Sequence, residues 1–587
     1  MANYFLITTA LTDTWDISKK ILFLGEWCKE NHIKSTWENL NSKTQSYHWN
    51  DREKLKNDYS YSKKLYEDLI YELAKNLNLY HKTNYSNRYW KIVMGPWLLS
   101  FMQAVLERYR NIEQLKNDKN EYETIVLEID KNIILPKTFE MYSRLLLSDT
   151  WNHFIFSEII KHIKIPYKIT VRKKKFNDKE RFGEYLNQKN YTKVNKLYSS
   201  LTSFFKKKII NEKFLISDSY LGFVDEIKLN LKLGCFPKYN NFINPKENNI
   251  NNEERKKYIL GNFNSKNEFE KILCELIKIQ IPLAYFENFK EFKKITENIN
   301  WPSKPKVIFT SHFLQKTVQA IYTAEKVEQF NTKLIHGQHG GVYGQYLFST
   351  AQDHELDVCD KFLSWGWKNL KNEKIIPFGI IKNITKIKYN KKNDKILLIL
   401  KGQTRYTHRI NSYSGSFQLH NYFKECINFC KKIDHLIKND KLTVRIHARR
   451  YWNEDSLFRN EFPTLHIDGG YKPINKIISN YRLVVQSYLS TGYLETLASN
   501  FPTVVFANLN DCLLNKDTLE DIKILSEAKI FHTNYDSAAD FIKKNYENID
   551  DWWKSDITQN ARIIFCEKYA NKNKNKIDHL IKILRAH

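Results

Sequence analysis

Residues 483–506 carry a pattern typical of an anion-binding site. The apolar run at 483–485 predicts a buried strand, and a small polar segment leads from it into a predicted helix over 491–499. Ser490 or Thr491 stands at the helix N-cap. Because free N–H groups and the helix dipole both favour negative charge there, the pattern predicts a phosphate site. Glu495, one turn on, would face the same ligand; the alternative is a plain helix cap with a solvated Glu495.

A second candidate is a glycine-rich loop that carries two histidines. A predicted strand at 333–335 delivers His336 and His339 into a segment with four glycines: Gly337, Gly340, Gly341 and Gly344. Glycine lets the backbone approach a ligand closely, and imidazoles act as acid, base or phosphate partner near neutral pH. A zinc site has little support, because no third ligand has a recognisable spacing. A purely structural turn is the other interpretation.

Three further strand ends carry polar or charged side chains. The predicted strand 307–311 ends at His312, and the first predicted strand, 4–8, is followed by a polar turn that contains Asp13. The predicted strand 442–446 runs into a basic segment with Arg445, His447 and Arg449. Loops at the ends of strands are where α/β domains place their chemistry, so all of these residues are candidates.

The elements that must position these residues alternate between short strands and helices. Amphipathic patterns predict helices over 51–80 and 93–109, and strands resume after an asparagine-rich loop at 237–258. A chain of 587 residues is too long for one core. The sequence predicts an α/β domain over 1–380 with a helical and basic insertion at about 51–260, a linker at 382–393, and a second α/β domain over 381–587.

The chain is strongly basic, with 93 Lys and Arg against 66 Asp and Glu and a formal charge of +27. Such a surface attracts nucleic acid, anionic lipid or phosphorylated substrates. The sequence contains no zinc-finger spacing and no RNP motif, so nucleic acid is not an expected partner. The densest basic runs lie at 172–175 and 206–208. They form either a solvated surface or a patch that faces anionic lipid or an acidic acceptor.

The compartment follows from the cysteines and from the apolar runs. None of the eight cysteines forms a Cys-x-x-Cys pair, which favours buried thiols and a cytoplasmic protein. The N-terminus lacks the basic region and the long apolar core of a signal peptide. The longest apolar run, 93–106, is of a length that usually means a buried helix. We therefore expect a soluble or peripheral protein.

Several motifs along the chain resemble those of a family of transferases found in bacterial O-antigen and capsule loci. They are Phe5-Leu-Ile-Thr-Thr-Ala-Leu-Thr-Asp-Thr-Trp15, Leu22-Phe-Leu-Gly-Glu-Trp-Cys28, Trp151-Asn-His153, His336-Gly-Gln-His-Gly-Gly341, Trp365-Gly-Trp367 and Ser490-Thr-Gly-Tyr-Leu-Glu-Thr-Leu497. Two α/β units in series also resemble GT-B glycosyltransferases. The resemblance implies a GT-B-like α/β fold, with two Rossmann-like domains that face a cleft and helical insertions in the first domain.

A looser likeness extends to capsule enzymes that use CMP-activated ulosonic acids and to CDP-glycerol glycerophosphotransferases. There, a strand that ends in a basic motif precedes a Ser/Thr-rich helix start that holds the nucleotide phosphate. Arg445, His447 and Arg449 stand at the basic motif, but the usual His-Pro is His447-Ala448 in this chain. This departure leaves open which residue binds the phosphate.

The resemblance implies a cytoplasmic, metal-independent glycosyltransferase at the inner face of the membrane. Its partners would be a nucleotide-sugar donor, used as substrate and not as a cofactor, and a polysaccharide or lipid-linked acceptor. The residues expected to bind the donor are Arg445, His447, Arg449, Ser490, Thr491 and Glu495; those expected to supply a catalytic base are Asp13, His312, His336 and His339. The alternatives are a CDP-polyol phosphotransferase and a noncatalytic carbohydrate-binding scaffold.

Overall fold

The structure, a computed structural model, describes residues 3–118, 120–165, 167–174, 212–237, 245, 248–312, 315–384, 387, 389–413 and 415–587. Most of the predicted basic segment, including the run at 206–208, lies outside the described residues. Within them the chain forms three sheets, and every strand pair is parallel. Strands buried on both faces explain the continuous apolar runs in the sequence: all four residues of β7 (Val307–Thr310) are buried.

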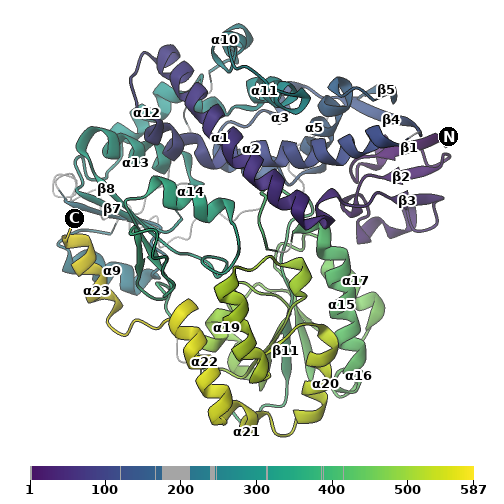
Figure 1. Cartoon of the computed structure of the whole chain (residues 1–587), viewed down its shortest axis with the longest axis vertical. Coiled ribbons are helices and arrows are strands. Elements are labelled where there is room, and N and C mark those ends of the chain that lie inside the picture. The colour runs from purple at the N-terminus through teal and green to yellow at the C-terminus, as the bar shows by residue number, and fades with distance from the viewer. Residues whose placement is uncertain are drawn as a thin grey trace.

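The first sheet has the strand order β3-β2-β1-β4-β5. Its strands are β1 (Asn3–Ile7), β2 (Ile21–Phe23), β3 (Ser42–Thr44), β4 (Glu121–Glu128) and β5 (Tyr167–Lys173). Two long helices, α1 (Arg52–His81) and α2 (Asn87–Glu113), cross and contact one another (Figure 1). Asp51 starts α1 by accepting hydrogen bonds from the N–H groups of Glu53 and Lys54. Helix α2 is buried along most of its length and also contacts α5 (Asp149–His162).

The second sheet has the order β10-β9-β8-β7-β6. Besides β7 it contains β6 (Phe214–Ile216), β8 (Lys333–Gly337), β9 (Lys361–Ser364) and β10 (Ile375–Pro377). Helices α13 (Thr317–Phe330) and α14 (Thr350–Val358) connect it to α2, which both of them contact. The second sheet is therefore joined to the first through a shared buried helix.

The third sheet has the order β13-β12-β11-β14-β15-β16. Its strands are β11 (Ile396–Ile399), β12 (Leu442–Arg445), β13 (His466–Asp468), β14 (Leu483–Gln486), β15 (Thr503–Phe506) and β16 (Phe531–His532). Numbered within the sheet, this order is 3-2-1-4-5-6, that of a Rossmann domain. Helix α18 (Thr491–Ala498) follows β14. An α/β fold with Rossmann-like units is thus confirmed.

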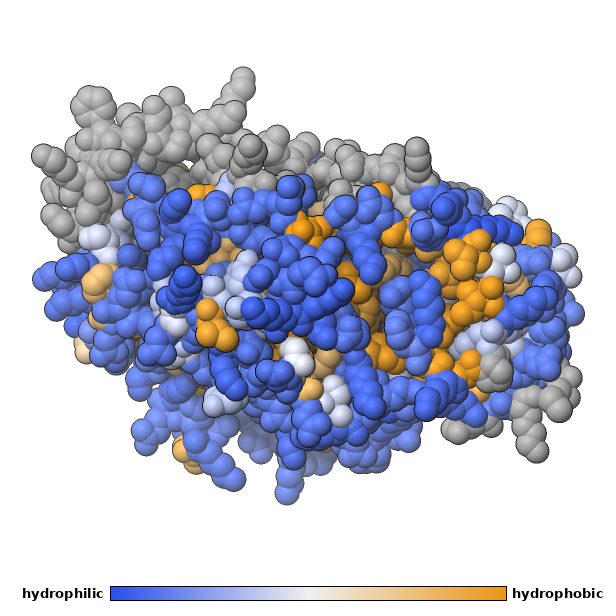
Figure 2. Space-filling view, turned by 90° about the horizontal axis from the view of Figure 1, so that it is seen from above, coloured by the Kyte–Doolittle hydropathy of each residue, from blue (hydrophilic) through white to orange (hydrophobic). Residues whose placement is uncertain are grey.

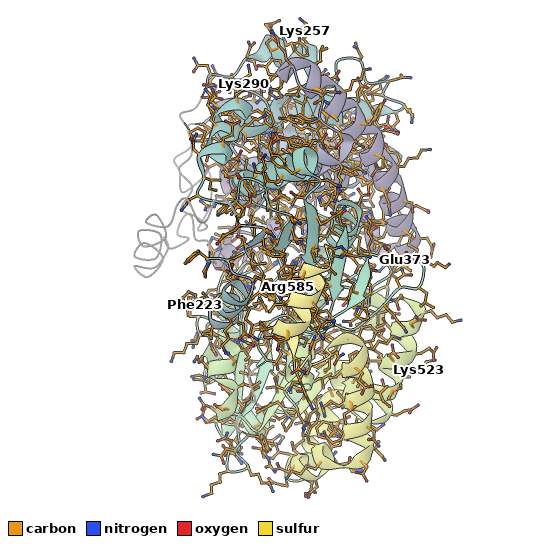
Figure 3. The ribbon with its side chains drawn as sticks, turned by 90° about the vertical axis from the view of Figure 1, so that its left-hand side faces the viewer. Phe223, Lys257, Lys290, Glu373, Lys523 and Arg585 are labelled. Atoms are coloured by element: carbon orange, nitrogen blue, oxygen red, sulfur yellow. The ribbon has the colours of Figure 1, made fainter. Side chains whose placement is uncertain are left out.

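The end of the chain returns to the second sheet. Helix α23 (Lys576–Arg585) packs on α9 (Phe223–Lys232), and its Leu580, Ile581 and Leu584 belong to the apolar cluster of that sheet. Figure 3 shows the two helices side by side, with Phe223 and Arg585 labelled. Residues 1–380 therefore contain two sheets, and residues 381–587 contain the third sheet together with a helix that covers the second.

The polarity of the surface and the burial of the cysteines match what the sequence composition predicts. The face shown in Figure 2 is mostly hydrophilic, with apolar side chains gathered in separate patches. All eight cysteines are free and buried, which confirms the expected core thiols. Among the described residues, no helix is long and apolar enough to cross a membrane.

Candidate functional site

The strand order of the third sheet reverses between β11 and β14. In parallel sheets of this kind, ligands bind in the crevice beyond the carboxyl ends of the strands at such a reversal. The chain leaving β14 enters α18, and the chain leaving β11 enters the segment 400–413. An alanine Cβ at Gly402 would lie 2.4 Å from the ring of His447, so the loop after β12 meets the same edge.

The N-terminus of α18 has no side-chain cap. Ser490 occupies the N-cap position that the sequence predicts, but its hydroxyl makes no capping hydrogen bond. The Thr491 Oγ1 atom instead accepts a hydrogen bond from the N–H of Gly341, at 2.9 Å. Beneath the first turn, Gln486 is buried and neither polar atom of its amide has a partner among the described residues. The helix start therefore keeps polar groups for a ligand.

The glycine-rich loop after β8 lies directly against this helix start. A Cβ on Gly341 would come within 2.6 Å of the carbonyl oxygen of Ser490, so a side chain there would force the two loops apart. At Gly340 the nearest atom to such a Cβ is 3.5 Å away, an ordinary contact. The predicted loop thus brings its histidines to the edge of the third sheet from the second sheet.

Three histidines and a glutamate gather behind this loop. The ring centroids of His312 and His339 are 4.9 Å apart, and those of His336 and His339 are 6.4 Å apart. Glu355 on α14 approaches His336 Nδ1 at 3.6 Å and His339 Nδ1 at 3.9 Å. The Tyr343 hydroxyl donates to Glu355 Oε1 at 3.1 Å. Three of the predicted catalytic candidates therefore form one cluster.

Burial makes this cluster electrically neutral. Desolvation lowers the pKa of His339 to about 3, with smaller contributions from His312 and Arg409, and holds the pKa of His336 well below its ordinary value. Desolvation raises the pKa of Glu355 to about 8. Although the distances would suit ion pairs, burial favours the uncharged form of each partner. Near neutral pH the site therefore contains neutral imidazoles beside a protonated carboxyl group.

Arg409, on the segment that follows β11, places a positive charge beside this neutral cluster. Its charge lowers the pKa values of His312, His339 and Glu355. It is half-buried and forms no ion pair with any described residue. By contrast, Arg405 on the same segment is paired with Glu30 at 2.7 Å and with Asp149. A half-buried cation without a counter-charge is costly, so this position is suited to an anion.

Glu495 lies at the edge of the same junction. Its Oε1 accepts a hydrogen bond from the Lys382 Nζ atom at 2.7 Å. That ammonium group lies 5.9 Å from the ring centroid of Tyr220, whose ring is 6.4 Å from that of His339. Glu495 is thus paired with a lysine, and Tyr220 links that pair to His339.

The side chains of the basic motif after β12 form hydrogen bonds and stacking contacts with nearby residues of the chain. The Arg445 guanidinium donates to Asp468 at 2.6 Å and to the carbonyl oxygens of Gly470 and Lys472. The ring of His447 stacks on Tyr451, with centroids 5.5 Å apart, and its Nδ1 accepts from the Arg449 N–H. The guanidinium of Arg449 donates to the Tyr451 hydroxyl at 3.0 Å. These contacts stabilise the loops at 445–472, and Arg445 has most of its donors occupied.

The fourth candidate base lies elsewhere. Asp13 is in the turn after β1, where it pairs with Lys174 and its carbonyl accepts from Arg172 at 3.0 Å. Within the described residues, none of its hydrogen bonds or ion pairs reaches the imidazole cluster. In the same part of the chain, no group of three or more His, Cys, Asp or Glu side chains is arranged to hold a metal ion.

Sequence reasoning missed Arg409, Glu355 and Tyr343. Arg409 lies in the loop after the predicted strand 395–400, and its place in a loop that follows a strand was the available signal. Glu355 lies within a helix, and Tyr343 lies in the glycine-rich loop itself, next to Gly344. No local pattern distinguishes these two residues from ordinary polar side chains.

The Rossmann strand order of the third sheet and the facing loops of the second define an α/β fold of the GT-B-like kind. The chain belongs to the LIC12162 family of transferases, whose family model matches residues 4–584. It is therefore a transferase, and the predicted resemblance is confirmed. Among curated proteins none matches the sequence.

Solved structures offer weaker likenesses. The wall teichoic acid polymerase TagF is 12% identical in sequence. The match covers 51% of this chain and 76% of the TagF chain, with a TM-score of 0.31. A S. aureus TarM variant in complex with fondaparinux, α-GlcNAc-glycerol and UDP is 13% identical in sequence. The match covers 47% of this chain and 55% of the TarM chain, with a TM-score of 0.31. Acinetobacter baumannii MurG is 10% identical in sequence. The match covers 51% of this chain and 77% of the MurG chain, with a TM-score of 0.29. Likenesses at these TM-scores are too weak to transfer an activity.

Proposed function

We propose that the protein is a glycosyltransferase that moves a sugar from a nucleotide-sugar donor to a carbohydrate acceptor. The observation that carries this proposal is the uncompensated Arg409 beside the imidazole cluster, whose glycine-rich loop contacts the N-terminus of α18. A cation, free backbone N–H groups and a Rossmann strand reversal together suit the phosphates of a nucleotide. Transfer from such a donor leaves a nucleotide phosphate whose charge must be stabilised.

In this proposal the donor phosphates lie against the start of α18. Ser490 and Thr491 supply the helix N-terminus, and the backbone at Gly341 forms the facing wall. Arg409 compensates the charge that develops on the leaving phosphate, which is worth more inside a preorganised site than in water. The Lys382–Glu495 pair borders the same space, where the carboxylate can accept hydrogen bonds from ribose hydroxyls.

His339 is the proposed base for the acceptor hydroxyl. In the absence of donor its imidazole is neutral, so it is able to accept a proton, but a pKa of about 3 makes it a weak base. A bound phosphate anion nearby would raise that pKa, because a negative neighbour stabilises the imidazolium form. Donor binding would thereby prepare the base for the transfer step.

The finer assignment is to synthesis of a surface polysaccharide. The resemblance to transferases of O-antigen and capsule loci supports a polysaccharide or lipid-linked acceptor, a CMP-activated ulosonic acid or another sugar as donor group, and a metal-independent reaction. A position at the inner face of the cytoplasmic membrane fits the same resemblance and the net charge of +27.

The decisive experiment incubates the purified enzyme with nucleotide-sugars and with CDP-polyols, together with polysaccharide and lipid-linked acceptors. Released nucleotide and the phosphate content of the product are measured. The proposal expects nucleotide release that depends on a nucleotide-sugar, with a product that contains no new phosphate. A product that gains phosphate would identify a polyol phosphotransferase, and binding without nucleotide release would identify a noncatalytic scaffold.

A further inference from the structure

The segment that carries Arg409 has no regular secondary structure of its own. Between the end of β11 and residue 416, the described residues contain no helix or strand. Parts of this segment are nevertheless buried, among them Thr407 and Ile410. A buried backbone outside helices and sheets needs other partners for its N–H and carbonyl groups. The residues that supply those partners therefore fix the place of Arg409.

Helix α2 supplies partners on both sides of Arg409. The Oε1 atom of Gln103 accepts a hydrogen bond from the Ile410 N–H at 2.9 Å. The Arg108 guanidinium, which is fully buried, donates to the carbonyl oxygen of Thr407. Hydrogen bonds from one helix of the first sheet thus reach the chain two residues before Arg409 and one residue after it.

Helix α14 bonds to the same segment at its own N-terminus. The Thr350 N–H donates to the side-chain oxygen of Asn411 at 3.0 Å. The Thr350 hydroxyl lies 2.8 Å from the Ile410 carbonyl oxygen and 3.0 Å from Gln103 Oε1, and its single proton bonds to one of them at a time. The same helix carries Glu355, which approaches two imidazoles. Helix α14 therefore links this segment to the imidazole cluster.

Gln103 is the residue at which these contacts meet. Its side chain is buried, and its Nε2 atom donates to the Ser62 hydroxyl oxygen of α1 at 3.2 Å. That hydroxyl donates to the Tyr59 carbonyl at 2.8 Å, so it accepts from the amide and fixes its orientation, with Oε1 directed at Ile410. A buried amide costs free energy unless its hydrogen bonds are made. A glutamine at this core position therefore indicates a specific use.

We infer that Gln103 is a positioning residue for the transfer reaction: it holds the backbone beside Arg409, so that the guanidinium keeps its place at the imidazole cluster. A charge stabilises a developing anion best when it is already in place, and a long arginine side chain loses much rotamer freedom when it is fixed. The inference rests on the proposed function, in which Arg409 compensates the charge of the donor phosphate. Gln103 acts only through Arg409.

The test begins with Gln103→Met, which removes the acceptor and nearly keeps the volume of the side chain. Gln280→Met, on α11 (Glu268–Gln280), is the matched control, because Gln280 is also buried and its Oε1 accepts from the Trp151 indole N–H at 2.9 Å. We expect both variants to lower the melting temperature. Only Gln103→Met should speed hydrogen exchange of the backbone amides of residues 404–413, roughly tenfold.

Titration calorimetry of UDP, CDP and CMP then tests the link to Arg409. Gln103→Met should lower the nucleotide affinity roughly three- to tenfold in the wild-type background, and less than about twofold in the Arg409→Gln background. A merely structural loss would lower the affinity by the same factor in both backgrounds. Gln280→Met should leave the affinity unchanged. If Gln103→Met does not fold, Thr350→Val takes its place with the same expectations, since it removes only a hydroxyl from the contacts of Ile410.

Three results overturn the inference. They are wild-type exchange rates in residues 404–413, equal losses of affinity in the two backgrounds, and an Arg409→Gln variant that loses affinity while Gln103→Met does not. If Arg409→Gln itself binds nucleotide as the wild type does, the proposed function fails at Arg409 and the inference falls with it. The Arg409→Gln single variant thus separates failure of the inference from failure of the proposed function.

Discussion

Replacing Glu355 by Gln should remove a large pH dependence from the stability of the second sheet. Burial raises the pKa of this carboxyl group from 4.5 to about 8, so the folded state holds a proton that the unfolded state releases between these values. The resulting stabilisation is fully present below pH 4.5 and is lost as the pH rises to about 8. Gln keeps the size of the side chain and can accept from Tyr343, but it does not titrate.

The magnitude follows from the size of the shift. Each pKa unit corresponds to about 1.4 kcal/mol, so a rise from 4.5 to about 8 amounts to roughly 5 kcal/mol of stability between those pH values. For a domain of 150–250 residues this is a change in melting temperature on the order of 10 °C. The wild type should lose that much more than Glu355→Gln between pH 5 and pH 9.

Thermal unfolding followed by circular dichroism at pH 5, 7 and 9 measures this difference. Glu373→Gln is the control, since Glu373 is exposed at the surface (Figure 3) and its replacement should leave the wild-type pH dependence in place. If wild type and Glu355→Gln lose stability in parallel, Glu355 is ionised at neutral pH. The imidazole cluster would then be an ion-paired network, and the neutral base proposed at His339 would be wrong.

Three further predictions concern the loops around the site. Gly341→Ala should lower turnover about tenfold or more, because its Cβ would lie 2.6 Å from a carbonyl oxygen of the facing loop. Gly340→Ala should keep a turnover near that of the wild type. Steady-state kinetics that show equal losses of turnover in the two variants would contradict this prediction. His339→Asn should lower kcat roughly 10²- to 10⁴-fold at an unchanged melting temperature, and a joint loss of stability and activity would reveal a structural turn. Arg445→Ala should destabilise the protein by about 1–3 kcal/mol in urea unfolding, because it leaves a carboxylate unpaired; unchanged stability with weaker nucleotide binding would make it a phosphate ligand instead.

The strands and the two main loops could be predicted because parallel strands leave a direct trace in the sequence. A strand covered on both faces is a continuous apolar run, as in β7 and β14, and the polar residues after it mark the edge where ligands bind. The helix start at Ser490 and the glycine-rich loop followed from local residue types alone. Their direct contact, through Thr491 and Gly341, also depends on how the second and third sheets pack.

The number of sheets and the partners of the charged residues could not be read in this way. Strand β6 pairs with β7 although about ninety residues of chain separate them, and nothing in either short run specifies that pairing. The same limit applies to the arginines. Arg445 follows a strand, as a phosphate ligand would, but Asp468 on the neighbouring strand binds it. Arg409 has no such partner among the described residues, and only the folded structure distinguishes the two.

The central claim is that Arg409 binds the phosphate of a nucleotide donor. It is tested most directly by titration calorimetry of UDP, CDP and CMP against the wild type, Arg409→Gln and Arg459→Gln. Arg459, on the exposed side of α17 (Glu454–Glu461), gives the same change in charge away from the site. The account predicts that Arg409→Gln lowers the affinity for the nucleotide roughly tenfold to a hundredfold, which is the effect of losing a charged hydrogen bond. Arg459→Gln should leave the affinity unchanged. Equal affinities in all three proteins would contradict it.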